Sequence, residues 1–393
     1  MIPAPLQNLL DQVVGNNAFY TAKFAGRSTF KTLSDIPFTT KAEWVEDQLN
    51  NPPYGTNLTY PIERYTRFCQ TSGTTGKPMR WLDTNESWAW MLDNWEQVYR
   101  ASGVVPGDKV FCAFSFGPFL GFWTAYDCAS RMGCMAIPGG GLSSVARLKV
   151  MLDNGVNALC CTPTYALHLA QVAAAEGLDL VGSTVRAVIV AGEPGGSIPA
   201  TRAAIEQGFG ATLYDHHGMT EVGPVTIPHA EGLQIITESY FAEVPETDES
   251  GLGELVLTTL GRVGSPLIRY RTGDLVRLRA DDGVLLGGIL GRADDMRIVR
   301  GVNIYPAAVE AVLRRLPGIA EYRVRVKEVG ALTELEIDIE PLESQSAAER
   351  QQLVAGATKQ LREAFSMRIP VALVESGALP RFELKANRWV DAP

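Results

Sequence analysis

Short apolar runs alternate with segments of helical periodicity between residues 106 and 214. The runs at 108–116, 134–138, 157–163 and 185–193 show no polar face, which predicts strands buried on both faces of a sheet. The segments around them predict helices at 122–132, 144–154, 163–175 and 199–207. Strands that alternate with helices in this way predict parallel βαβ units and a layered α/β fold.

Three glycine-rich or polar stretches directly follow predicted strands. They are PGGG at 138–141, GEPGG at 192–196 and YDHHGMTE at 214–221. In sheets of this kind ligands bind outside the carboxyl ends of the strands. We therefore expect these stretches to lie near a binding site.

The pattern changes after about residue 292. Residues 305–316 have helical spacing, two alternating runs follow at 321–330 and 335–340, and a last helical segment runs from 353 to 365. This order predicts a small α+β domain whose strands have polar outer faces. We expect an N-terminal domain at residues 1–293, large, layered and with mostly parallel sheets, and a small C-terminal α+β domain at residues 294–393.

Composition limits the partners of the protein. The 393 residues are 46% hydrophobic and 20% charged, and the formal net charge is −9 with a pI near 5.2. An acidic chain of ordinary globular composition argues against a nucleic-acid surface, which needs clustered Lys and Arg. The N-terminus shows no signal-peptide pattern and no apolar run approaches about 18 residues, so we expect no membrane span. The six cysteines show no CxxC spacing and several lie in apolar runs, as expected for buried, reduced thiols of a cytoplasmic protein.

One polar stretch, TSGTTGKP at 71–78, combines hydroxyls, glycines and a lysine. Gly, Ser and Pro are common in surface turns, so a turn is one interpretation. The other is a phosphate cradle, because glycines let backbone N–H groups approach an anion while hydroxyls and a lysine add donors and charge. It is not a nucleotide-kinase loop, because that motif requires GxxxxGK[ST].

Three further stretches carry candidate chemistry. Thr220 could donate to a phosphate and Glu221 could hold a divalent cation, although a polar loop is the ordinary interpretation. Asp274 lies in a Thr-Gly-Asp turn, where its carboxylate could accept ribose hydroxyls or simply stabilise the turn. Arg292 and Asp294 lie at the expected domain boundary.

Together and in this order, these stretches resemble the adenylate-forming superfamily of acyl-CoA synthetases, adenylation domains and luciferases. The motifs FTTKAEW, TSGTTGKP, RYRTGDL, GRADDMRIVRGVNIYP and LPRFELKANRW are most similar to those of the phenylacetate-CoA ligase branch. The resemblance covers most of the chain. It implies an ATP-dependent ligase that converts an acid to acyl-AMP with release of pyrophosphate and then forms the coenzyme A thioester. It also implies that the C-terminal domain is a mobile lid.

The resemblance implies roles for individual residues. The loop would handle the β- and γ-phosphates of ATP through Thr71, Ser72, Gly73, Thr74, Thr75, Gly76 and Lys77. Thr220 would contact the α-phosphate, Glu221 would hold Mg²⁺, and Asp274 would hold the ribose with Arg292 nearby. The stretches that follow the strands add Gly192, Glu193, Asp215, His216 and His217 to the nucleotide site.

The lid is implied to carry three further functional positions. Lys385 matches the lysine that meets the acyl carboxylate and the α-phosphate, where a cation offsets the repulsion between two anions. Without the upstream motifs, the ordinary interpretation of Lys385 would be a solvent-exposed lysine of the C-terminal tail. Asp294 matches the hinge, and Gly301 matches the position that borders the pantetheine tunnel.

The chain departs from the family pattern in two places. His217 stands where the family usually has Tyr, so its assigned stacking on adenine is open, and His216 could line the acyl pocket instead. Cys161 is the last cysteine of the chain, whereas members of this branch often carry a later Cys and His cluster. We therefore expect no structural zinc site of that kind.

Aromatic residues gather where the strand at 108–116 runs into the next helix, the position of the acyl pocket in the similar enzymes. The predicted pocket comprises Phe116, Phe119, Phe122, Trp123, Tyr126, Gly140, His216 and Gly218. Ring walls with glycines beside them favour a flat aromatic or aryl-acetic acid, although some of these rings could be ordinary core residues.

Several alternatives remain open at this point. Coenzyme A is the preferred acceptor, with a carrier-protein thiol or an amine as alternatives. A catalytically silent acyl or nucleotide binder of the same fold is a hypothesis of a different class. The expected partners are a small carboxylic acid and coenzyme A, with no nucleic acid and no membrane. The oligomeric state is not predicted, and a homodimer is one option.

Overall fold

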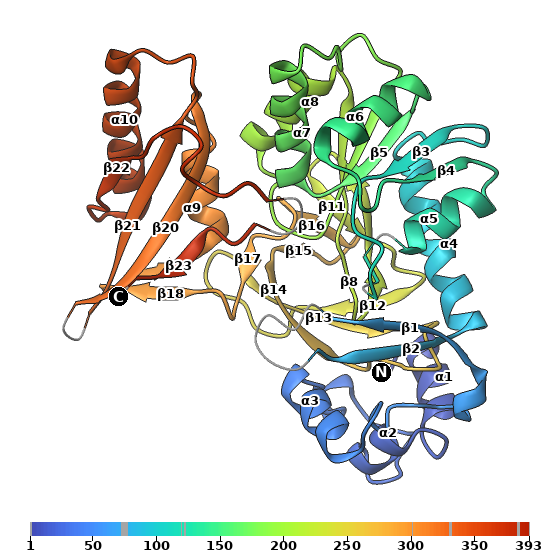
Figure 1. The fold of residues 1–393 in the computed structure, drawn as a ribbon. Helices are drawn as coiled ribbons and strands as arrows, with labels where there is room; N and C mark the ends of the chain where they lie inside the picture. The colour runs from blue at the N-terminus through green and yellow to red at the C-terminus, as the bar shows by residue number, and fades with distance from the viewer. Residues whose placement is uncertain are drawn as a thin grey trace.

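The computed structural model describes residues 2–71, 78–118, 120–121, 123–300, 302–329, 332–382 and 386–392. Figure 1 shows a large N-terminal part and a smaller C-terminal part beside it, which contains α9, α10 and β20 to β23.

A five-stranded sheet lies at the centre of the N-terminal part. Its spatial order is β4 (Met135–Pro138), β3 (Lys109–Cys112), β5 (Ala158–Cys161), β6 (Ala187–Val190) and β7 (Thr212–Asp215). Every neighbouring pair is parallel. The prediction of parallel strands from the alternating pattern is therefore confirmed.

Two hydrophobic clusters cover the two faces of this sheet. In β3, Val110 and Cys112 belong to one cluster and Phe111 to the other, as expected for a strand whose side chains alternate between faces. The helices α4 (Asn85–Ala101) and α5 (Trp123–Arg131) contribute to the first cluster. The second cluster is built with α6 (Ser144–Asp153), α7 (Pro163–Ala175) and α8 (Pro199–Phe209), and Figure 1 shows the two helix groups on opposite sides of the strands.

The strand β4 departs from its prediction. The run at 134–138 was expected to be buried on both faces, but Met135 is 58% exposed. The reason is its place at the edge of the sheet, where it has a neighbour on one side only. An edge strand can be as apolar in sequence as a central one, so the prediction of full burial was wrong here.

Residues ahead of the sheet form a helical cap and a hairpin. The cap contains α1 (Ala4–Val13), α2 (Ala18–Lys23), α3 (Lys41–Asn50) and the single turns η1 (Leu33–Asp35) and η2 (Ile62–Arg64). Thr40 begins α3 with a capping box, in which its backbone N–H donates to Glu43 Oε2 at 2.8 Å. The hairpin pairs β1 (Tyr65–Gln70) with β2 (Arg80–Thr84).

Antiparallel sheets follow β7. One has the order β10 (Thr226–His229), β11 (Gly232–Ile235), β16 (Val284–Leu286) and β15 (Leu278–Arg279). A second has the order β12 (Tyr240–Glu243), β13 (Gly253–Thr259), β14 (Tyr270–Val276) and β17 (Gly291–Arg292). A ribbon of β8 (Gly218–Met219) and β9 (Gly223–Pro224) lies between β7 and these sheets in the chain.

The C-terminal part has a hydrophobic cluster of its own, formed by buried residues from 299 to 369. Its sheet has the order β22 (Val371–Leu373), β21 (Leu332–Pro341), β20 (Ile319–Val329) and β23 (Trp389–Asp391). The remaining elements are β18 (Arg297–Val299), β19 (Val302–Ile304), α9 (Pro306–Leu313) and α10 (Ala347–Phe365). The polar positions of β20 and β21 form ion pairs, with Arg323 and Arg325 both bound to Asp338.

Among the described residues, no helix combines the length and the apolar character needed to cross a membrane.

All six cysteines are buried and unpaired. Burial raises the pKa of Cys69 and of Cys128 to about 12, so both are protonated at neutral pH. Since the thiolate is the reactive form, we predict that no cysteine of the folded protein reacts rapidly with a disulfide reagent at pH 8, whereas all six react in guanidinium chloride. Spectrophotometric thiol titration measures this, and rapid reaction in the folded state would contradict it.

Candidate active site

The predicted phosphate loop connects the two strands of the β1–β2 hairpin. At its base, the Thr71 N–H donates to the Met79 carbonyl at 2.9 Å, and the Met79 N–H donates to Thr71 Oγ1 at 3.0 Å. The neighbouring Gln70 N–H donates to the Pro118 carbonyl at 2.6 Å, which joins this hairpin to the segment after β3. The rest of the predicted cradle lies outside the described residues: Ser72, Gly73, Thr74, Thr75, Gly76 and Lys77.

A buried ion pair connects the hairpin to the Thr-Glu loop, the turn between β8 and β9 that contains Thr220 and Glu221. Arg262 donates to both carboxylate oxygens of Asp83, at 2.7 and 2.6 Å, and both side chains are fully buried. The remaining nitrogen of Arg262 donates to the carbonyls of Thr220 and Glu221, at 2.9 and 2.8 Å. One guanidinium therefore fixes β2 and the backbone of the two predicted catalytic residues.

Glu221 is the predicted magnesium ligand. The residue is 8% exposed, and Lys41 Nζ lies 3.9 Å from its Oε1. Within the described residues, no group of three or more His, Cys, Asp or Glu side chains converges on one point. A single carboxylate fits Mg²⁺ bound with a nucleotide, because that ion commonly takes one or two protein carboxylates and completes its shell with phosphates and water.

The predicted ribose ligand, Asp274, lies on β14 directly opposite Arg292 on β17. Its Oδ1 accepts from Arg292 Nη1 at 2.9 Å, and its Oδ2 lies 3.1 Å from His217 Nε2. Burial alone would raise the pKa of Asp274, but His217 and Arg292 outweigh burial and hold that pKa below its usual value. The carboxylate is thus kept ionised as a hydrogen-bond acceptor.

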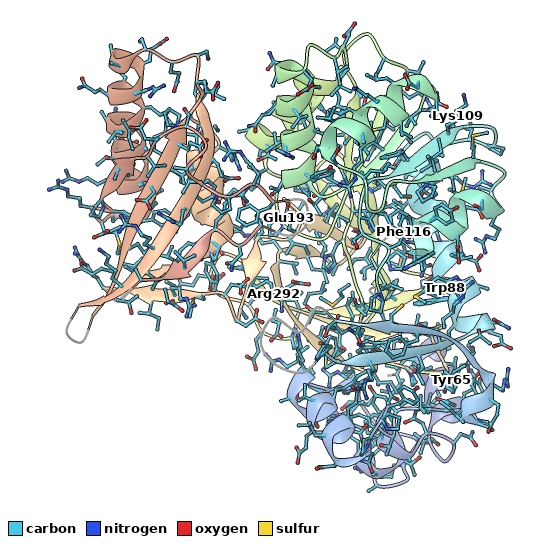
Figure 2. The ribbon with its side chains drawn as sticks, in the orientation of Figure 1. Tyr65, Trp88, Lys109, Phe116, Glu193 and Arg292 are labelled. Carbon is cyan, nitrogen blue, oxygen red and sulfur yellow. The ribbon has the colours of Figure 1, made fainter. Side chains whose placement is uncertain are left out.

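Arg292 also reaches the predicted hinge. Its Nε and Nη2 donate to the two carboxylate oxygens of Asp294, at 2.9 and 3.1 Å. Asp294 remains 63% exposed at its side chain. Arg292 therefore connects the predicted ribose ligand to the chain that enters the C-terminal part, and Figure 2 shows it between the two parts.

Two buried titratable residues lie at the end of β7: Asp215 is its last residue and His216 directly follows it. Asp215 Oδ2 accepts a hydrogen bond from the Ser197 hydroxyl at 2.5 Å, and burial raises the pKa of Asp215 to about 6. His216 is 4% exposed, and burial lowers its pKa to about 3, so the imidazole is neutral at pH 7. Its ring meets Trp95 edge to face, with centroids 4.5 Å apart. Neither ring nitrogen of His216 has a hydrogen-bond partner among the residues that the structure describes.

Four residues of the predicted acyl pocket lie together: Phe116, Trp123, Tyr126 and Gly140. The ring of Phe116 is 4.6 Å from that of Trp123 and 5.5 Å from that of Tyr126, both at steep angles. Gly140 borders the same ring, because a Cβ at that position would lie 3.1 Å from Phe116 Cδ2. Two other predicted pocket residues lie outside the described residues: Phe119 and Phe122.

Asp127, on α5, is the one charged residue in the stretch at 114–128 that contains these rings. The Trp88 indole N–H donates to its Oδ2 at 3.0 Å, and Arg67 lies 3.2 Å from the same oxygen. Its charge is therefore paired with Arg67 and hydrogen-bonded to Trp88. This leaves the ring cluster without an unpaired charge from Asp127.

The remaining predicted positions are two residues that follow β6, one residue of the β8–β9 ribbon and two residues of the C-terminal part. Gly192 follows β6 with φ +95°, a backbone conformation that favours glycine. Gly218 pairs with Pro224 in the β8–β9 ribbon. Glu193 accepts two backbone hydrogen bonds, from Thr164 at 2.8 Å and from Ala386 at 2.9 Å. Two predicted positions of the C-terminal part lie outside the described residues: Gly301 and Lys385.

Sequence reasoning missed residues that act at long range. Arg262 and Asp83 lie in none of the motifs that carry the resemblance, and Lys41 lies in FTTKAEW but has no role assigned to it. Arg262 and Lys41 contact the Thr-Glu loop from other parts of the chain, and Asp83 holds Arg262. Trp95 lies in an ordinary amphipathic helix, so nothing in its sequence marks it as the neighbour of His216. Tertiary structure alone brings these residues to the site.

Comparison with known proteins agrees with this geometry. The family model described as AMP-binding enzyme matches residues 43–250, and the model described as AMP-binding enzyme C-terminal domain matches residues 301–392. A phenylacetate-coenzyme A ligase of Pseudomonas putida is 32% identical over 91% of this chain and 84% of its own length. The chain belongs to the AMP-binding enzyme family, and its class within it is that of the AMP-forming acid-coenzyme A ligases.

Two solved states of one related enzyme also differ in their likeness to this chain. A 2-hydroxyisobutyryl-CoA ligase in the postadenylation state, with 2-HIB-AMP bound, matches with a TM-score of 0.91 at 27% identity, over 99% of this chain and 88% of that one. The same ligase in the thioesterification state, with 2-HIB-AMP and CoA, matches with a TM-score of 0.70 at 28% identity, over 98% and 88%. Since identity and coverage are nearly equal, the difference reflects how the parts are arranged. The arrangement of this chain is therefore more similar to the postadenylation state than to the thioesterification state.

The buried ion pair generates a stability prediction. Asp83→Asn leaves the charge of Arg262 buried without a counter-charge, which costs about 3–5 kcal/mol in comparable pairs. We expect a loss of that size in the free energy of unfolding, measured with urea. The control is Glu86→Gln, which removes the charge of the exposed pair with Arg64 and should lower the free energy of unfolding far less, because solvent screens exposed pairs. Equal losses in the two variants would contradict the assigned importance of the buried pair.

The buried imidazole generates a pH prediction. Because the folded-state pKa of His216 is about 3 and the unfolded value about 6.5, the unfolded chain binds a proton first as pH falls, and stability decreases. Asp215 has the opposite effect between about pH 6 and pH 4, because burial raises its pKa to about 6. Asp215 and the neighbouring His217 are present in both the wild type and the variant, so their contributions cancel in the comparison. Between pH 6.5 and 5 the wild type should lose about 2 kcal/mol more than His216→Phe. The free energy of unfolding of both proteins is measured with urea across this pH range. An equal pH dependence in the wild type and His216→Phe would contradict the prediction.

Proposed function

We propose that this chain activates an aromatic or aryl-acetic acid as its acyl-AMP and transfers the acyl group to coenzyme A. The observation that carries the substrate class is the cluster of Phe116, Trp123 and Tyr126 beside Gly140. Rings at steep angles with a glycine next to them suit a flat apolar group. The paired state of Asp127 supports a substrate without a charge on its ring.

We further propose that the acid carries a hydroxyl or amino group that pairs with His216. A buried polar group without a partner is unfavourable, so a bound substrate that supplies a donor gains affinity there. The neutral imidazole has one acceptor and one donor nitrogen, which suits a hydroxyl in particular.

A short 2-hydroxy acid is the second candidate substrate. The observation that favours it is the full-length likeness to the 2-hydroxyisobutyryl-CoA ligase, which binds such an acid as its adenylate. His216 would serve the hydroxyl of either acid. The two candidates differ in how much of the aromatic cluster the substrate fills.

The chain's own residues would hold ATP at the junction of the parts. We assign the phosphates to the loop at 71–77 and to Thr220, and the ribose to Asp274, supported by Arg292. Arg262 keeps the backbone of Thr220 in place before the substrate arrives, which favours a preorganised site. Glu221 would hold Mg²⁺, and that ion would offset the negative charge of the phosphates.

The C-terminal part is proposed to act as a lid, with residues 294–393 turning about Asp294. In the first arrangement Lys385 would stabilise the attack of a carboxylate oxygen on the α-phosphorus, with pyrophosphate as the leaving group. In the second, the thiol of coenzyme A attacks the acyl carbon and AMP leaves with one of the carboxylate oxygens. Gly301 would border the path of the thiol. A carrier-protein thiol remains the alternative acceptor.

Isotope exchange tests the activation step. With Mg²⁺ and without coenzyme A, we expect acid-dependent exchange of labelled pyrophosphate into ATP, strongest with hydroxy- or aminobenzoic and aryl-acetic acids. Lys385→Ala should lower the rate by about 10²–10³, because it removes the cation from the reacting phosphate. The matched control is Lys359→Ala, on an exposed position of α10, which should keep the wild-type rate.

The panel separates the candidate functions. Exchange with short 2-hydroxy acids only would support the second candidate and contradict the aromatic one. A folded protein that binds ATP but exchanges with no acid would contradict the proposed enzyme and favour a silent binder. Full exchange in Lys385→Ala would contradict the role given to that lysine.

A further inference from the structure

A short C-terminal segment, residues 386–388, lies against the start of α7 in the N-terminal part. Glu193, which follows β6, bridges the two. Its Oε1 accepts from the backbone N–H of Thr164, the second residue of α7, at 2.8 Å. Its Oε2 accepts from the backbone N–H of Ala386 at 2.9 Å. Figure 2 shows Glu193 where the two parts meet.

A second contact joins the same two surfaces. Arg388 is 6% exposed, and its Nε and Nη2 donate to the carboxylate oxygens of Glu321 at 2.6 and 3.1 Å. Its two terminal nitrogens also lie 3.3 and 3.4 Å from Thr164 Oγ1. Its ion pair with Glu321 lies within the C-terminal part, so only the Thr164 hydroxyl comes from the other side.

Together these contacts connect the two parts in a way that can break and re-form. On the N-terminal side, the helix start and the bond from Thr164 hold the carboxylate of Glu193 in place whatever the C-terminal part does. On the C-terminal side, Glu321 holds Arg388 in place in the same way. Separation would expose one backbone N–H and one guanidinium edge to water without breaking either internal arrangement.

These contacts between the two parts form in the arrangement that this structure has. The structure is more similar to the postadenylation state of the related ligase, with a TM-score of 0.91, than to its thioesterification state, with a TM-score of 0.70. Ala386 directly follows Lys385 in the sequence. A bond that fixes the N–H of Ala386 therefore restricts where the preceding residue can lie.

We propose that Glu193 is a positioning residue for adenylation: it holds the chain that carries Lys385 against α7 and releases it when the lid turns. This inference rests on the proposed function, because it uses the role given to Lys385. It also gives Glu193 a different task from direct nucleotide binding, since both carboxylate oxygens already accept backbone hydrogen bonds.

The test compares the two half-reactions in Glu193→Gln. A glutamine has the same shape, but its single carbonyl oxygen can accept only one of the two bonds and its NH₂ group would face an N–H donor. The control is Glu206→Gln, because Glu206 accepts the backbone N–H of Leu213 at 3.0 Å within the N-terminal part. Pyrophosphate exchange reports adenylation, and thioester formation from supplied acyl-AMP and coenzyme A reports the second step.

We expect Glu193→Gln to slow exchange by about tenfold to a hundredfold, the equivalent of one charge-assisted hydrogen bond, at an unchanged KM for ATP. Thioester formation from supplied acyl-AMP should stay at or above the wild-type rate. Backbone amides of the 386–392 peptide should also exchange faster with deuterium. Glu206→Gln should change none of these.

A second variant covers the case in which Glu193→Gln does not fold. Thr164→Val removes the acceptor of Arg388 but keeps the backbone donor to Glu193, so it should lower exchange in the same direction by a smaller factor. Thr201→Val, at a buried threonine of α8, is its control.

The outcomes separate this inference from the proposed function. A wild-type protein that shows no acid-dependent exchange contradicts the proposed function itself. If the wild type exchanges, equal loss of both half-reactions in Glu193→Gln overturns the inference alone. A raised KM for ATP with an unchanged maximal rate would also overturn it, because that result assigns Glu193 to the nucleotide.

Discussion

The guanidinium of Arg262 connects segments that are far apart in the sequence and close together in the site. It is fully buried, it holds Asp83 of the β1–β2 hairpin through two hydrogen bonds, and it donates to the backbone of the Thr-Glu loop. A buried ion pair has a desolvation cost, which good geometry and additional acceptors must offset. Here the additional acceptors are the carbonyls of Thr220 and Glu221. The hydrogen bonds that offset the desolvation of Arg262 therefore also fix the backbone of Thr220 and Glu221, the residues proposed to contact the phosphate and the metal.

The same logic of paired charges extends to the junction of the two parts. Asp274, Arg292 and Asp294 form a chain of contacts from the antiparallel sheet to the segment that enters the C-terminal part. Also at the junction, Glu193 and Arg388 are each held by a contact within their own part in addition to their contact with the other part. Contacts of this kind can break and re-form without disturbing either core, which suits the proposed turn of the C-terminal part.

The pattern of apolar and polar residues predicted those strands and helices whose burial depends mainly on their own sequence. The apolar runs at β3, β5 and β6 gave strands with both faces buried, and the helix α7 has the predicted bounds, because burial and periodicity act along the chain. The run at β4 looked the same and lies at the edge, since the sequence of one strand does not state how many neighbours it has. The motifs predicted Thr220, Glu221 and Asp274 as site residues, but they predicted neither the ion pair of Arg262 with Asp83 nor the bond from Ala386 to Glu193. Both of these contacts join residues separated by more than a hundred positions, and folding alone brings them together.

The central claim is that an acid is activated on the α-phosphorus of ATP before its acyl group moves to a thiol. Labelling both carboxylate oxygens of an accepted acid with ¹⁸O tests it most directly, with mass spectrometry of the AMP formed in the presence of coenzyme A. If acyl-AMP is the intermediate, one labelled oxygen leaves in the phosphate of AMP and the other stays in the thioester. Unlabelled AMP, or label in orthophosphate with ADP as the product, would contradict the account.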